Sequence, residues 1–152
     1  SHTPHRCAVA DGTVVWTPVG CGARVDGLPQ IIWSDGTPWR AANTWALERA
    51  TTKEVSLKTV RSNLSALHRY ATWLEQSRTD WRHFPARKAD RCLVRFRGKL
   101  IKDRDAGKLA PSTTSQTMTA VVQFYRWLHV SGLISPDWPM WRDRIFGVQR
   151  VD

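Results

Sequence analysis

The stretch from Leu57 to Leu74 constrains the fold of this chain more than any other part of the sequence. Apolar residues recur there at steps of three and four positions: Leu57, Val60, Leu64, Leu67, Ala71 and Leu74. Because an α-helix turns once every 3.6 residues, this spacing places them all on one face. Tyr70 and Trp73 widen that face. The pattern predicts a long amphipathic helix that begins near Ser56 and buries one side.

Three other segments have helical periodicity. Thr37-Pro38 is typical of a helix start, because threonine can cap the free N–H groups and proline fits in the first turn. A further helix is expected from Lys88 to about Asp105, and another from Pro111-Ser112 to a stop at Gly132. The residues predicted to face inward in these helices are Trp39, Ala42, Ala46 and Ala50, then Ala89, Leu93, Phe96 and Leu100, then Thr114, Met118, Val121, Tyr125 and Leu128. Helices joined by short connections predict an all-α antiparallel bundle of four to five helices.

The two ends of the chain differ from this helical middle. Residues 1–37 are expected to be an irregular extension with a short hairpin, because the β-branched runs Thr13–Trp16 and Gln30–Trp33 lie between turn-forming residues. Residues 38–136 form the predicted helical domain. Residues 137–152 are a tail in which a short helix is expected from Trp141 to Phe146.

The excess of positive over negative charge is confined to one part of the sequence. The formal net charge is +10, yet basic and acidic side chains cancel in the residues up to Thr52. From Lys53 onward, 19 basic residues accompany 9 acidic ones. A one-sided cationic surface attracts polyanions, of which nucleic acid is the usual one, and the alternative is a basic surface that has no partner.

Several other classes of protein do not fit. No apolar run reaches the ~20 residues that span a bilayer, and the first residues do not form a signal peptide. The widely spaced Cys7, Cys21 and Cys92, with no C-x-x-C pair, favour ordinary thiols in a reducing cytoplasm over disulfides or a zinc site. We therefore expect no metal, no cofactor and no membrane partner.

Two of the predicted helices have polar side chains opposite their apolar stripes. In the helix after Ser56 these are Lys58, Ser62, Ser65, Arg69 and Thr72, with Arg61 at the margin; in the helix after Pro111 they are Ser112, Gln116, Thr119, Gln123 and Arg126. Such side chains hydrogen-bond phosphates and base edges, and a helix start rich in Ser and Thr offers free N–H groups to a phosphate. The basic residues of the helix after Lys88 are spread all round it, which fits a solvated face as well as a binding site.

The order of these motifs along the chain resembles that in one protein family. Ser56-Leu57-Lys58-Thr59-Val60, followed by Leu64, Leu67, Tyr70 and Trp73-Leu74, resembles the first long helix of the core-binding (SAM-like) domain of tyrosine recombinases, the phage integrase family. Ser112-Thr113-Thr114, then Phe124 to Leu128 and Gly132 to Pro136, resembles the last helix of that domain and the residues after it. The likeness covers about residues 31–136, and Ser135 departs from the asparagine that is common there.

The resemblance implies a domain that clamps double-stranded DNA together with other recombinase protomers, in site-specific recombination such as DNA integration. A separate C-terminal domain would supply catalysis, so we expect no catalytic residue and no enzyme activity in this chain. We expect a bacterial or phage-encoded protein in the cytoplasm, associated with the nucleoid. Tyr70 and Tyr125 lie on apolar stripes and are predicted to be core residues rather than nucleophiles. The residues expected to contact DNA are Lys53, Lys58, Thr59, Arg61, Ser62, Ser65, Arg69, Ser112, Thr113, Thr114, Gln116 and Arg126.

Two alternatives stay open at this point. One is a free-standing helical regulator that binds nucleic acid as a complete protein. The other is a protein-interaction module whose basic face meets an acidic partner. A nuclease or another enzyme is the weakest option, because the sequence has no clustered carboxylates and no nucleophile beside a base.

Overall fold

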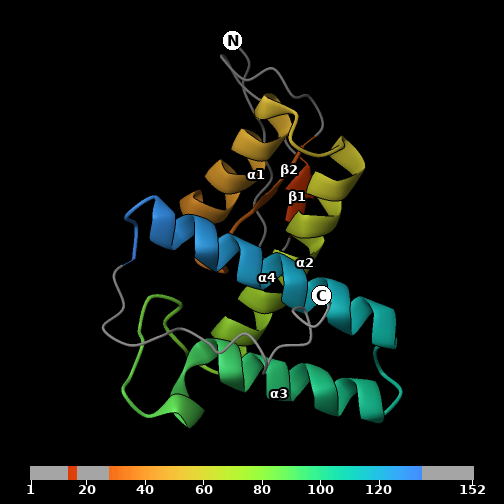
Figure 1. Ribbon diagram of the computed structural model, residues 1–152, viewed down its shortest axis with the longest axis vertical. Helices are drawn as coiled ribbons and strands as arrows, with labels where there is room; N and C mark the ends of the chain where they lie inside the picture. The colour runs from red at the N-terminus through yellow and green to blue at the C-terminus, as the bar shows by residue number, and fades with distance from the viewer. Residues whose placement is uncertain (1–13, 17–27, 135–152) are drawn as a thin grey trace. The chain divides into compact units, whose positions relative to one another are not determined.

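The chain is predominantly helical. A computed structural model describes residues 14–16 and 28–134, and within these ranges it has four α-helices, one short 3₁₀ helix and two short strands (Figure 1). The predicted all-α class is therefore confirmed, whereas the helix expected from Trp141 to Phe146 lies outside the described residues. Contacts divide the chain into two compact units, Ser1–Glu75 and Gln76–Asp152, and the division falls inside the range predicted as one helical domain.

The first unit contains a small antiparallel ribbon. Strand β1 (Val14–Trp16) pairs antiparallel with β2 (Pro29–Ile31), as predicted. Strand β2 begins one residue earlier and ends two residues earlier than expected. The side-chain amide of Asn43 accepts a hydrogen bond from the N–H of Ile31 at 2.8 Å and donates one to its carbonyl at 3.1 Å. These backbone groups of β2 are thus satisfied without a third strand.

Helix α1 (Arg40–Thr52) begins later than the sequence predicted. Thr37 does not cap it, because its N–H and its hydroxyl both donate to Oδ1 of Asp35, at 2.9 and 2.6 Å, in a turn where Gly36 has φ +92°. The hydroxyl of Thr37, and then its N–H, lower the pKa of the Asp35 carboxyl below its usual value. The inward side of α1 is as predicted, and Trp45 adds a large ring that the spacing missed: the buried residues are Trp39, Ala42, Trp45, Ala46 and Ala50.

Helix α2 (Leu57–Gln76) is the predicted amphipathic helix. Its apolar stripe is buried from Val60 to Leu74, and Tyr70 stacks on Trp73 with ring centroids 5.9 Å apart. Leu57 was expected inside, but it is 41% exposed. Residues 56–59 are all exposed, so the first turn of α2 extends beyond the packed face.

In the second unit, α3 (Cys92–Asp105) begins later than Lys88, because Lys88–Asp90 forms the separate 3₁₀ helix η1. Arg91 at the junction is buried, and its guanidinium donates to the carbonyls of Pro85 and Ala86 at 2.9 and 2.7 Å. These bonds hold the chain in a turn before α3. The expected inward position of Ala89 was therefore wrong, since it is exposed, whereas the next predicted core residues are buried: Leu93, Phe96 and Leu100.

Helix α4 (Pro111–Val130) runs antiparallel to α3 (Figure 1). It starts at proline as predicted and stops before Gly132, whose φ is +75°. Its predicted stripe is buried, and so is a second row that the sequence analysis did not include: Thr117, Ala120 and Phe124. Among the described helices, none combines the length and the apolar character needed to cross a membrane.

Candidate nucleic-acid interface

The polar face of α2 is exposed as predicted. Lys58, Arg61, Ser62 and Ser65 are exposed, and Arg69 is half-buried one turn further along. Lys53 is exposed just before the helix, where a left-handed conformation (φ 59°) ends α1. Because these positions are three or four residues apart, the hydroxyls lie between the cationic side chains on one surface of the helix.

No acidic side chain neutralises this face from within its own helix. The one carboxylate of α2, Glu75, lies in the last turn. It accepts hydrogen bonds from the N–H and the hydroxyl of Ser34, at 3.0 and 2.8 Å. Glu75 is therefore engaged away from the cationic part of the helix.

The start of α2 is capped by its own chain. Oγ of Ser56 accepts a hydrogen bond from the N–H of Thr59 at 3.2 Å, and the two hydroxyls lie 3.2 Å apart. A phosphate at this helix end would compete with the cap. A contact through Thr59 would therefore have to replace hydrogen bonds that the helix start already makes.

Helix α4 has an acid-free polar face of its own. Ser112, Gln116, Gln123 and Arg126 are exposed, and Thr113 is half-buried. Helix α4 contains no acidic residue, and its N-cap provides no side-chain hydrogen bond. These features fit the predicted contacts to phosphates and base edges.

Thr114 does not belong to that face. It is buried, and its hydroxyl donates to the carbonyl of Ala110 at 3.1 Å. In the sequence analysis Thr114 appeared both as a core position and as a DNA contact, and the packing supports the first of these roles. We leave it out of the set of DNA contacts.

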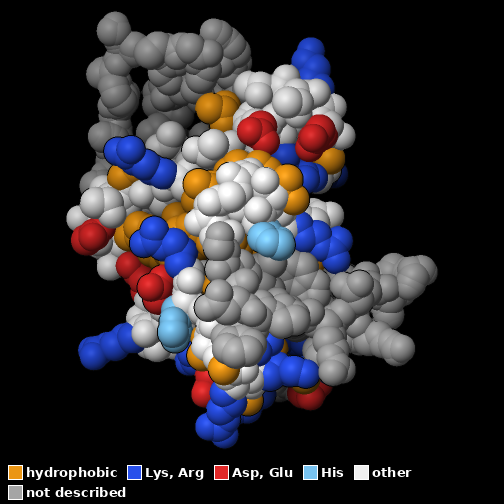
Figure 2. Space-filling model, turned by 60° about the vertical axis from the view of Figure 1, so that its left-hand side comes forward, with side chains coloured by type: hydrophobic (Ala, Val, Ile, Leu, Met, Phe, Trp, Pro, Cys, Tyr) orange, Lys and Arg blue, Asp and Glu red, His pale blue; other side chains and the backbone are white. Residues whose placement is uncertain are grey.

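The charges of α3 are arranged differently. Nζ of Lys99 lies 2.8 Å from the Asp103 carboxylate, and Nε of Arg104 lies 3.3 Å from that of Asp105. Arg95 donates to the hydroxyl of Thr79 at 2.9 Å. On the face drawn in Figure 2, Lys and Arg side chains lie at several separate places, with Asp and Glu close to some of them. The basic character of α3 is therefore partly neutralised by Asp103 and Asp105.

The two tyrosines are core residues, as predicted. Both are fully buried, and the hydroxyl of Tyr125 donates to the carbonyl of Trp81 at 2.7 Å, with the Cys92 thiol 3.6 Å away. Among the described residues, no three His, Cys, Asp or Glu side chains gather where they could hold a metal ion.

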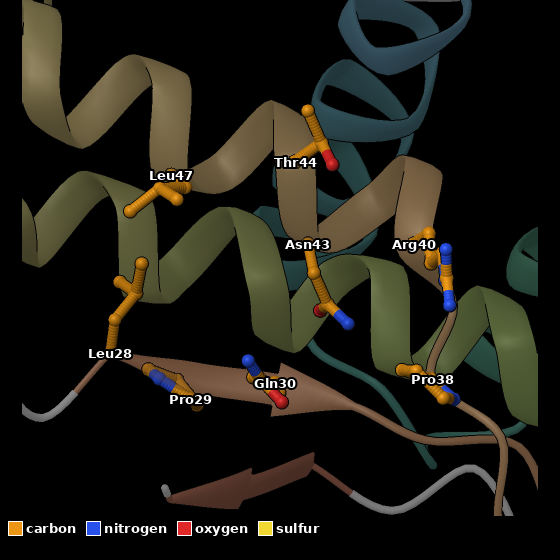
Figure 3. A pocket seen from close by; sticks show the side chains of 8 residues that line it. All are labelled: Leu28, Pro29, Gln30, Pro38, Arg40, Asn43, Thr44 and Leu47. Atoms are coloured by element: carbon orange, nitrogen blue, oxygen red, sulfur yellow. The ribbon is translucent and has the colours of Figure 1, made fainter. Parts of the chain in front are cut away.

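A cavity of about 290 Å³ lies between β2 and α1 (Figure 3). Leu28 and Leu47 stand at one end of it and Arg40 at the other, and Asn43 reaches toward the strand between them. The Asn43 amide is already bonded to the backbone of Ile31. With a mostly apolar lining and one cation, this cavity has little to offer a polyanion.

We compared the chain with protein-family models, curated proteins and solved structures. None matches it. The residues described above are therefore the basis on which a function can be proposed.

Proposed function

We propose that this chain binds duplex DNA, mainly through backbone phosphates, as the core-binding domain of a tyrosine recombinase. The observation that carries the proposal is the cationic face of α2, on which the helix itself places no acidic side chain. Lys58, Arg61 and Arg69 supply positive charge along about three turns, with Ser62 and Ser65 between them. Short hydroxyls let a phosphate backbone approach closely, and long cationic side chains can then reach the phosphates on either side.

The second unit supports the same function through α4. Gln116 and Gln123 are amides that can bond to base edges in a groove, and Arg126 can bond to a base or a phosphate. The order of the sequence motifs supports the family. In this proposal the chain acts in the bacterial cytoplasm, and recombinase protomers bind the duplex together.

We expect binding to a labelled duplex to depend steeply on salt. Binding constants fall with a slope of about −0.9 per neutralised phosphate, so three or four contacts would weaken binding on the order of 40- to 150-fold between 50 and 200 mM salt. Fluorescence anisotropy at several salt concentrations would measure the slope. A second duplex of unrelated sequence should give a similar slope. No binding at low salt, or a flat response, would contradict the proposal, and tighter binding to an acidic polypeptide would favour a protein-interaction module.

We also expect the chain to leave DNA uncut. Tyr70 and Tyr125 are both fully buried, so neither hydroxyl can attack a phosphodiester without unfolding. Supercoiled plasmid incubated with the chain, then denatured and digested with protease, should contain no nicks and no covalent protein adduct. An adduct that maps to either tyrosine would overturn both the core assignment and the proposed family.

A further inference from the structure

We infer that a small cavity between α3 and α4 binds a single phosphate group. The inference rests on the proposed function where that phosphate belongs to DNA. The cavity has a volume of about 100 Å³ and lies wholly within the second unit. Two arginines, Arg97 and Arg104, line it together with Ser115, and no carboxylate is among its lining residues.

The two arginines approach the cavity from the same side of α3. They are seven residues apart, which is two helical turns or about 10.5 Å along the axis. Ile101 lies between them, and Leu100 forms part of the lining. A guanidinium is always charged and its planar set of donors matches two oxygens of a phosphate. A small cavity lined by two arginines therefore suits an oxyanion.

The opposite wall of the cavity comes from α4. The Thr114 hydroxyl is turned back to the carbonyl of Ala110, so the exposed Ser115 supplies the hydroxyl that a ligand can reach. Ser115 lies one turn after Ser112 and one turn before Thr119, next to the acid-free polar face of α4. A phosphate in the cavity would therefore lie at the border of the surface already proposed to meet DNA.

The size and the surroundings of the cavity favour a compact anion. Its volume is that of about three water molecules, whereas sites for larger ligands span roughly 300–1,000 Å³. Buried Leu100 and Met118 form an apolar floor. Nε of Arg104 is 3.3 Å from the Asp105 carboxylate, so an anion in the cavity would meet that guanidinium through its two terminal nitrogens.

The sequence shows the two arginines seven positions apart, but it does not indicate that both line one cavity. The basic residues of α3 looked evenly spread, and the structure divides them into two groups. Arg97 and Arg104 line the cavity beside α4, and Arg104 also contacts Asp105, whereas Lys99 is paired with Asp103 and Lys102 lies outside the cavity.

A matched pair of double variants tests the inference. R97Q/R104Q removes the two cavity charges, and K88Q/K102Q removes two charges from exposed positions outside the cavity. Inorganic phosphate, titrated against equal ionic strength of chloride, should shift the amide NMR signals of Ser115 and Met118 in the wild-type chain and in K88Q/K102Q, but not in R97Q/R104Q. On a duplex, R97Q/R104Q should lower the salt slope by about one, which makes the loss of affinity between 50 and 200 mM about 3.5-fold smaller than in the wild type.

The possible outcomes distinguish a failure of the phosphate-site inference from a failure of the DNA-binding proposal. If the wild-type chain binds duplex DNA but phosphate shifts neither amide and the two double variants have equal salt slopes, the cavity is not a phosphate site and the DNA-binding proposal stands. If phosphate shifts both amides but the wild-type chain does not bind DNA, the cavity takes a free phosphate and the proposed function fails. Circular dichroism checks that each variant is folded. If R97Q/R104Q lost helix, the phosphate titration of the wild-type chain would decide whether the cavity binds phosphate.

Discussion

Replacing Leu67 by alanine should destabilise the chain by roughly 2–5 kcal/mol, the usual cost of removing a buried leucine side chain. Leu67 is fully buried in the middle of α2, in the same stripe as Leu64 and Ala71. The truncation removes contacts that the surrounding side chains can replace only by shifting, so part of the volume stays as a cavity. Denaturant unfolding followed by circular dichroism would measure the change in the free energy of unfolding.

The matched control is the same substitution at Leu57. That side chain belongs to the same sequence pattern but is 41% exposed, so Leu57→Ala should change the free energy of unfolding by no more than about 0.5 kcal/mol. Equal costs at the two positions would mean that the packed face of α2 has been assigned incorrectly. DNA binding by Leu67→Ala should fall only as far as the folded fraction falls.

The contrast between these two leucines shows what periodicity can predict. A repeat of three and four residues identifies the buried side of a helix, and it did so for α1, α2, α3 and α4. It does not show where packing stops along the helix axis, and so it misplaced Leu57. The predicted inward position of Ala89 was wrong for a related reason. The hydrogen bonds from Arg91 to Pro85 and Ala86 hold a turn where the pattern alone predicted an α-helix. Such contacts depend on which groups meet in the folded chain.

The candidate interface was predictable to a similar degree. Residue types and spacing predicted the polar faces of α2 and α4, and the exposure of Lys58, Arg61 and Arg126 agrees. Spacing placed Lys99 and Asp103 within reach of each other, because residues four apart on a helix are neighbours, but it could not show that the pair forms. Nor could it show the cavity at Ser115, which depends on the distance between two helices.

The double variant Lys58→Ala/Arg69→Ala should weaken duplex binding on the order of 60-fold at 0.1 M salt and lower the salt slope by about two. The two residues are eleven positions apart on α2, about 16 Å along the axis, so they would contact different phosphates. Lys58 is exposed and Arg69 half-buried, and neither belongs to the apolar stripe. The far-ultraviolet circular dichroism of the variant should therefore equal that of the wild-type chain, which makes the loss one of binding rather than of folding.

The control removes the same number of charges from α3, as Arg95→Ala/Lys99→Ala. It should cost much less affinity, because Lys99 is already paired with Asp103 and Arg95 is bonded to Thr79. A larger loss in this control than in the α2 variant, with helical content unchanged in both, would place the DNA against the outer side of α3. Equal losses would indicate a diffuse attraction to the net charge of the chain, in which no single helix face is the binding surface. A loss confined to the α2 variant is the result that the acid-free face of α2 requires.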